Sequence, residues 1–294
     1  MPRANNNGIE IEFDTIGDPN DEALLLVMGF TAQMIAWDEK FCRAFADKGY
    51  FVIRYDNRDC GLSTHLDGVA VDMAALFMAR TSGGDLPPVP YTLSEMAADG
   101  IVVLDALDIE RAHVIGASMG GMIVQTMAIE QPQRLRTVTS IMSTTGEPEY
   151  GQASPDAMAA LMRPPPSDRA QAIDASVEAS KIFSSPRYFD EARIRERAAA
   201  SYDRAFYPEG AGRQMAAIVA SGDRAGGLRN VTLPFLVIHG RADTLIDLSG
   251  GERTAELVPG ANLVVLNDMG HDLPEPLWPL IVDVIASHAT HAIG

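Results

Sequence analysis

The chain has 294 residues, of which 47% are hydrophobic and 21% charged, and 23 Lys and Arg against 40 Asp and Glu give a formal net charge of −17. These values exclude a disordered chain, and a field of that sign disfavours nucleic acid and anionic membrane surfaces as partners. No apolar run reaches the roughly 18 residues of a membrane span, and no apolar signal segment follows the polar N-terminus, so we expect a cytoplasmic protein.

Short runs rich in Val, Ile and Leu alternate with longer segments of helical periodicity. This alternation is typical of βαβ units and predicts an α/β fold with a mostly parallel, buried sheet. We expect strands, in chain order, at residues 9–15, 23–28, 50–55, 112–116, 138–143, 235–239 and 262–266. We expect helices at residues 37–48, 93–107, 119–131, 250–258 and 277–291.

Two stretches interrupt this alternation. Residues 65–90 form a long connection with one short helical pattern, and residues 147–230 hold several short helical patterns and no convincing strand. Long insertions in compact proteins are usually functional, although a merely structural excursion is the alternative. We therefore predict an α/β core made of residues 1–146 and 231–294, with residues 147–230 as an inserted helical cap.

Residues 116–120 read G-x-S-x-G, directly after a predicted strand and directly before a predicted helix. The bare pattern is weak evidence, so this context carries the inference. A sharp strand-to-helix turn exposes the Ser118 hydroxyl, and the small residues Gly116 and Gly120 permit such a turn. Ser118 is therefore the candidate nucleophile, and a serine needs a base, an acid to orient that base, and donors for an oxyanion.

The chain offers both partners in the order Ser, Asp, His. Asp243 follows one predicted strand and His271 follows the next. Because the loops after parallel strands meet at one edge of a sheet, these two residues can converge with Ser118. Asp247 and Glu147 are alternative acids, but the position of Asp243 just past the strand end favours it.

Further segments suggest a family. Residues 25–29 read LLVMG, residues 55–63 read YDNRDCGLS after the third predicted strand, and His271 follows a glycine. With these segments the chain resembles the α/β-hydrolase fold serine carboxylesterases over nearly its full length, and within them the bacterial group that contains aclacinomycin methylesterase. The resemblance implies that Ser118 is the nucleophile, that His271 is the general base and acid, and that Asp243 orients the histidine. This chemistry requires no metal or organic cofactor.

The family often has a His-Gly turn after the strand that supplies the first oxyanion donor, whereas this chain reads Met28-Gly29-Phe30. A backbone N–H needs no particular side chain, and Gly29 permits the turn. We therefore expect the N–H groups of Phe30 and Met119 to form the oxyanion hole.

Other reactive residue types have simpler expected roles. Cys42 and Cys60 are too few for a disulfide framework and lack the spacing of a metal site, so we expect reduced thiols. We expect Asp56 and Arg58 to hold their loop by ion pairing, and His239 at a strand end to pack rather than react.

Together these observations predict a hydrolase that cleaves carboxylic esters of small hydrophobic substrates through an acyl-enzyme. C–C bond or lactone hydrolysis, amide cleavage, acyl transfer and perhydrolysis are alternatives on the same triad. An alternative of another class is a non-catalytic relative that binds a small molecule, against which the complete set Ser118, Asp243 and His271 argues. The sequence leaves the natural substrate and the oligomeric state open.

Overall fold

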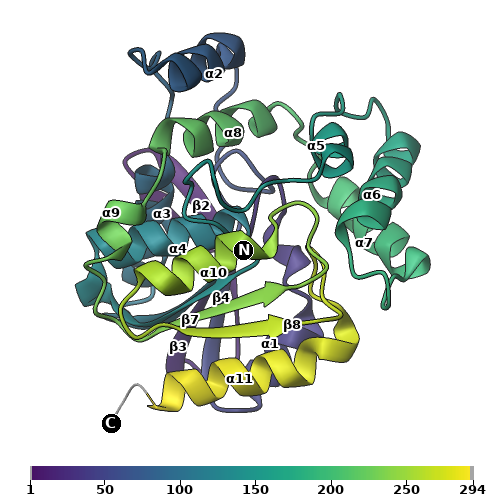
Figure 1. Ribbon diagram of the computed structural model, residues 1–294. Helices are drawn as coiled ribbons and strands as arrows, with labels where there is room; N and C mark the ends of the chain where they lie inside the picture. Colours follow the sequence, from purple (N-terminus) through teal and green to yellow (C-terminus); the bar gives the residue numbers. More distant parts are fainter. Residues whose placement is uncertain (1, 292–294) are drawn as a thin grey trace.

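A computed structural model describes residues 2–291 of the chain. The strands are β1 Arg3–Asn6, β2 Ile9–Ile16, β3 Glu22–Val27, β4 Tyr50–Tyr55, β5 Ala112–Ala117, β6 Leu135–Ile141, β7 Phe235–Gly240 and β8 Asn262–Leu266. They form one sheet in the order β1-β2-β4-β3-β5-β6-β7-β8 (Figure 1). The pairs β1–β2 and β2–β4 are antiparallel, and every pair from β4 to β8 is parallel.

The helices and 3-10 turns are η1 Met34–Ala36, α1 Glu39–Ala46, α2 Met73–Ser82, α3 Leu93–Asp105, α4 Met119–Glu130, η2 Pro132–Arg134, α5 Pro155–Leu161, α6 Arg169–Phe183, α7 Glu191–Arg204, α8 Gly210–Ser221, α9 Ala225–Leu228, α10 Leu248–Leu257, η3 Glu275–Leu277 and α11 Trp278–His291. Short polar side chains start several of them. Thr92 and Glu95 form a capping box at α3, and Asp168 and Asp190 accept backbone N–H bonds at the starts of α6 and α7.

The central strands β3, β4, β5 and β7 are buried almost along their whole length, and most of their residues are apolar. In β3, Leu25 and Val27 join one core cluster with α3 and α4, whereas Leu24 and Leu26 join the opposite cluster with α1 and α11. Successive side chains of a strand point to opposite faces, so the continuous apolar run fills both layers. This double burial fixes the strand ends from which the candidate site is built.

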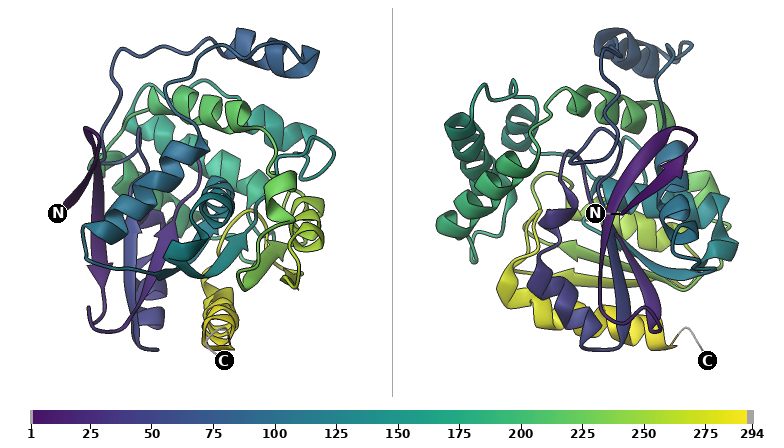
Figure 2. Two further views of the ribbon diagram at one scale, coloured as in Figure 1. Left: turned by 90° about the vertical axis from the view of Figure 1, so that its left-hand side faces the viewer. Right: turned by 180° about the vertical axis from the view of Figure 1, so that it is seen from behind.

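Helices α5 to α9 lie between β6 and β7 in the chain, which leaves the sheet after Ile141 at the end of β6 and re-enters it at Phe235 at the start of the neighbouring parallel strand β7. In Figures 1 and 2, α5, α6 and α7 group together at one side of the molecule, beyond the carboxyl ends of β7 and β8. Helix α8 continues from this group toward α2. In residues 147–230, all of which the structure describes, the regular elements are helical.

The structure differs from the sequence-based expectation in one additional strand and in the boundaries of two elements. Strand β1 was not predicted, since RANN has no apolar alternation, and it pairs only with β2 at the edge of the sheet. Strand β6 begins at Leu135 and ends at Ile141, earlier than the predicted range 138–143. The helix expected at 37–48 is shorter, because Asp38 caps α1 and the residues before it form η1. Within residues 2–291, none of the helices combines the length and apolarity needed to cross a bilayer.

Candidate active site

Ser118 lies at the sharp turn between β5 and α4. Its backbone has φ 57° and ψ −121°, a conformation that non-glycine residues rarely adopt. Two hydrogen bonds hold it there: the Ser118 N–H donates to the Ile141 carbonyl at 2.9 Å, and the Ser143 hydroxyl donates to the Ser118 carbonyl at 2.8 Å. Such strain persists only where the surroundings enforce it, and it is typical of functional sites.

The two glycines of the motif are required by close approach of backbone. A Cβ at Gly116 would lie 2.0 Å from the Gly120 carbonyl oxygen, and a Cβ at Gly120 would lie 2.1 Å from the Val27 carbonyl oxygen. No side chain can be accommodated at these distances without moving β3, β5 or α4. The spacing of the motif thus follows from the packing of the turn against the neighbouring strand.

The structure brings Ser118, His271 and Asp243 into one hydrogen-bonded row. His271 Nε2 lies 2.9 Å from Ser118 Oγ, and His271 Nδ1 lies 2.8 Å from Asp243 Oδ2. The other carboxylate oxygen of Asp243 accepts the N–H groups of Leu245 and Ile246, both at 2.9 Å. Asp243 is 6% exposed, so each of its oxygens is held by protein donors in a largely buried setting.

The two alternative acids have other partners. Asp247 caps α10, where it accepts the Ser249 N–H at 2.9 Å. Glu147 makes a two-point ion pair with Arg253, with both N–O distances at or below 2.9 Å. The geometry therefore favours Asp243 as the partner of the histidine.

His239 lies beneath this row and is fully buried. Its Nε2 lies 2.8 Å from the Ile246 carbonyl oxygen and 3.6 Å from Asp243 Oδ2. Burial lowers the pKa of His239, which favours the neutral imidazole. This buried position agrees with the expected packing role of His239. Its contact with the Ile246 carbonyl also supports the turn that carries Asp243.

The turn after β3 lies directly against the serine. A Cβ at Gly29 would lie 3.0 Å from Ser118 Cβ, so the peptide that carries the Phe30 N–H adjoins the candidate nucleophile. Met119 is the first residue of α4, whose N-terminus has a partial positive charge. Within residues 2–291, neither the Phe30 nor the Met119 N–H donates to a protein acceptor.

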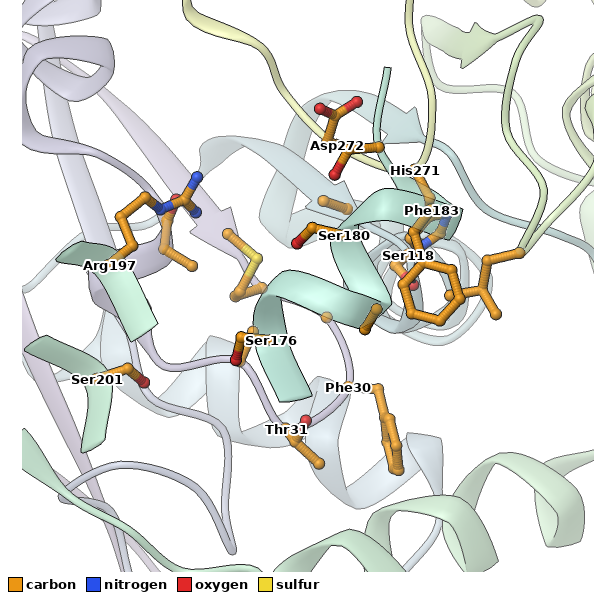
Figure 3. Close-up of a pocket in the computed structure, with 18 of the residues that line it drawn as sticks. Phe30, Thr31, Ser118, Ser176, Ser180, Phe183, Arg197, Ser201, His271 and Asp272 are labelled. Atoms are coloured by element: carbon orange, nitrogen blue, oxygen red, sulfur yellow. Dashed lines mark hydrogen bonds between the residues drawn. The ribbon is translucent and has the colours of Figure 1, made fainter. Parts of the chain in front are cut away.

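Ser118 and His271 open into a cavity of about 1630 Å³ (Figure 3). The core side of this cavity includes Phe30 and Met119, whose N–H groups are the expected oxyanion donors. The opposite side comes from α6 and α7 and adds polar groups that no local pattern predicted, including Ser176, Ser180, Arg197 and Ser201.

Figure 3 labels two charged residues at the cavity: Asp272 lies next to His271, and Arg197 lies on the other side of the view from Ser118. The Arg197 side chain donates to the Ala36 carbonyl at 3.3 Å. Burial raises the pKa of Asp272, whose Oδ1 accepts the Ser185 N–H at 3.0 Å. Asp272 directly follows His271 in the sequence. The position of Arg197 gave no such signal, because only folding of the helical segment, residues 147–230, brings α7 to the cavity.

The residues expected to hold the 55–63 loop do so by ion pairing. Arg58 pairs with Asp99 at 2.6 Å, and Asp56 pairs with Arg204 of α7 at 2.7 Å. Both carboxylates are almost fully buried. Cys42 and Cys60 are free and buried, as expected of thiols without a redox partner.

A model of the alpha/beta hydrolase fold family matches residues 22–275. The protein therefore belongs to the α/β-hydrolase fold family, which confirms the predicted fold. It is 29% identical to rhodomycin D methylesterase DnrP of Streptomyces peucetius, across 98% of this chain and 97% of that one. It is 27% identical to 3-oxoadipate enol-lactonase 2 of Acinetobacter baylyi, across 88% of this chain and 85% of that one.

Among solved structures, the chain resembles a meta-cleavage product hydrolase from Pseudomonas fluorescens IP01, with a TM-score of 0.78 and 18% identity across 99% of this chain and 98% of that one. That likeness shows the fold alone. The methylesterase relatives support the prediction of ester hydrolysis by an α/β hydrolase, and the predicted likeness to the methylesterase group is confirmed.

Proposed function

We propose that this protein is a serine hydrolase of carboxylic esters, with Ser118 as nucleophile, His271 as general base and acid, and Asp243 as the residue that orients the histidine. The observation that carries the proposal is the hydrogen-bonded row, in which both imidazole nitrogens lie within 2.9 Å of their partners, at the wall of a large cavity. A base held on both sides in this way can accept the serine proton without reorganising.

In the first half of the reaction, His271 Nε2 takes the Ser118 hydroxyl proton as Ser118 Oγ attacks the ester carbonyl. The carbonyl oxygen becomes an oxyanion, which the N–H groups of Phe30 and Met119 stabilise. The imidazolium then gives its proton to the leaving alcohol as the ester C–O bond breaks, and the acyl group stays on Ser118. Asp243 remains ionised and stabilises the imidazolium.

In the second half, His271 takes a proton from a water molecule that attacks the acyl-enzyme. The same two N–H groups stabilise the second oxyanion. Collapse of this intermediate returns the proton from His271 to Ser118 Oγ and releases the carboxylic acid.

We further propose that residues 147–230 act as a cap over a core made of residues 1–146 and 231–294. Support comes from α6 and α7, which form the wall of the cavity opposite Ser118. A cavity of about 1630 Å³ exceeds the ~300–1,000 Å³ of most small-molecule sites. We therefore propose that bulky hydrophobic esters are accepted as well as the small ones expected from the sequence, in line with the methylesterase relatives.

The test combines active-site labelling with turnover. We expect a fluorophosphonate to form one adduct, on Ser118 by peptide mapping, and we expect hydrolysis of p-nitrophenyl esters and of methyl esters with bulky acids. Ser118→Ala should fold and lose about 10⁴- to 10⁶-fold in kcat. Ser176→Ala is the control, since this hydroxyl lines the same cavity from α6, and it should retain the adduct and most of the turnover.

A folded, unlabelled wild-type protein without turnover would contradict the proposal and favour a non-catalytic binding protein. Lactone or C–C bond hydrolysis is the second candidate, because an enol-lactonase is among the relatives. Lactones and vinylogous diketones assayed beside matched esters distinguish these reactions. If the enzyme is labelled on Ser118 but turns over only lactones or diketones, the triad assignment stands and the proposed substrate class changes from esters to lactones or diketones.

A further inference from the structure

The turn that carries the Phe30 N–H is held from the side of the helical segment. Its next residue, Thr31, has φ 57°, which is unusual for a non-glycine residue. The Thr31 N–H donates to Oε1 of Gln214 at 2.8 Å. Figure 3 shows Phe30 and Thr31 side by side on this short turn at the cavity. The strained residue therefore adjoins the proposed oxyanion donor and depends on a side chain from α8.

Gln214 spans two segments of the core. Its Nε2 donates to the Arg58 carbonyl at 2.9 Å while its Oε1 accepts from Thr31, and the residue is fully buried. Only one orientation of the amide satisfies both bonds, since its acceptor must meet an N–H and its donor a carbonyl. Along the described chain the cavity is lined by the neighbouring Met215 and not by Gln214.

Helix α7 holds the same turn two residues later. The Gln33 amide donates to the carbonyls of Ser201 and Ala205, both at 2.7 Å, and its oxygen accepts from Arg204 at 2.7 Å. Arg204 in turn pairs with Asp56. The turn is thus attached to α7 and α8 at two points, one of which lies one peptide from the Phe30 N–H.

We infer that Gln214 is a positioning residue for the oxyanion hole: it fixes the Phe30–Thr31 peptide and thereby aims the Phe30 N–H at the reacting carbonyl oxygen. The inference rests on the proposed function. It follows that α8 takes part in building the catalytic geometry, although Gln214 contacts no substrate. Because a buried N–H left without an acceptor is costly, loss of Gln214 should let the Thr31 peptide rotate toward another partner.

The test compares Gln214→Met with Gln125→Met. Gln125 of α4 is an equally buried glutamine that also joins the helical segment to the core, since its Oε1 accepts from Arg224 at 2.9 Å. Both substitutions remove a buried amide of the same size, so both should lower thermal stability. Only Gln214→Met should lower kcat, by about 10- to 100-fold, somewhat less than the ~10²–10³-fold typical of losing an oxyanion donor. KM should change less than about threefold, because ground-state contacts remain.

A second readout reports on the oxyanion hole itself. A trifluoromethyl ketone forms a hemiketal oxyanion on the serine, so its inhibition constant should rise in Gln214→Met in proportion to the loss of kcat/KM. The inhibition constant of the carboxylic acid product should not change. Equal kcat and equal ketone affinity in the two methionine variants would overturn the inference.

Gln214→Glu covers the case in which the methionine variant does not fold. It keeps an acceptor for Thr31 and removes the donor to Arg58, so kcat should stay within about threefold of wild type, and a 100-fold loss in a folded protein would overturn the inference. Failure of the proposed function is distinguishable, since it would appear in the wild type as absent labelling of Ser118.

Discussion

The two sides of the cavity differ in how deeply their residues are buried. On the core side, ten of the 12 residues of α4 are buried, and Ser118 stands at its start. On the other side, none of the 14 residues of α7 is buried, and the helix carries four arginines. The core side is held by close packing of backbone, whereas the helical side is held by ion pairs and hydrogen bonds at separate points.

The two sides of the cavity should therefore tolerate substitution to different degrees. Close packing leaves no freedom at Gly116 or Gly120, so the residues proposed for chemistry keep one geometry. Point attachments such as Arg204 to Asp56 leave the side chains between them free to vary. Reaction and substrate selection can therefore be altered separately, except at the few positions where the helical side holds the core.

The largest expected effect concerns the two nearby carboxylates on the core side. Asp243→Asn should lower kcat by about 10⁴-fold, because the amide favours the wrong histidine tautomer. Asp247→Asn should leave kcat unchanged, since asparagine also caps helices well. Steady-state kinetics of both variants provides the measurement, and the reverse ranking would move the orienting role to Asp247.

The next effect compares two arginines on the helical side. Arg204→Met leaves Asp56 buried without its partner, and we expect a loss of about 3–5 kcal/mol in the free energy of unfolding. Arg169→Met removes an ion pair with Asp203 whose side chains are 50% and 56% exposed, and should cost less than about 1 kcal/mol. Urea denaturation measures the free energy of unfolding of both variants. Similar losses would mean that burial of an ion pair does not determine how much it contributes to stability.

Two glycines test the packing half of the comparison. Gly120→Ala would place a Cβ 2.1 Å from the Val27 carbonyl, so we expect a loss of about 3 kcal/mol. Gly212→Ala in α8 meets nothing within 4 Å and should stabilise the protein by up to about 1 kcal/mol. Thermal unfolding of the two variants checks the signs, and a tolerated alanine at position 120 would contradict the close-packing account.

The smallest effect is a pH dependence on the core side. Burial lowers the pKa of His113, His239 and His288. As the pH falls below the ordinary histidine value of about 6.5, the unfolded chain binds protons that the folded chain does not, so stability is lost by at most about 1.4 kcal/mol per histidine and pH unit. Burial raises the pKa values of Asp56 and Asp272, so protonation of these two carboxylates at low pH favours the folded chain and opposes the loss of stability.

His288→Gln tests this effect at one histidine of α11 that does not line the described cavity. The free energy of unfolding should fall less between about pH 7.5 and about pH 5.5 in this variant than in the wild type. An equal fall in both proteins would show that His288 takes up its proton alike in the folded and unfolded chain.

The sequence predicted those parts of the molecule that depend on local pattern. Apolar runs located seven of the strands, and strand-end position selected Ser118, Asp243 and His271, which the fold brings together. Strand β1 was not predicted, because a polar edge strand has no apolar periodicity. The sequence did not predict the hydrogen bond from Thr31 to Gln214 or the position of Arg197 at the cavity. Both depend on how separate helices pack, and residue spacing along the chain does not indicate that packing.

The place of the helical segment between β6 and β7 has a consequence for divergence and engineering. The segment leaves the sheet after Ile141, at the end of β6, and returns at Phe235, at the start of the neighbouring parallel strand β7, so its length does not alter the register of the two strands. A foreign segment of another size could be grafted between these points to accept other substrates. Such a graft must reproduce a buried acceptor at the place of Gln214, so that a chimera lacking it would fold and bind yet turn over slowly.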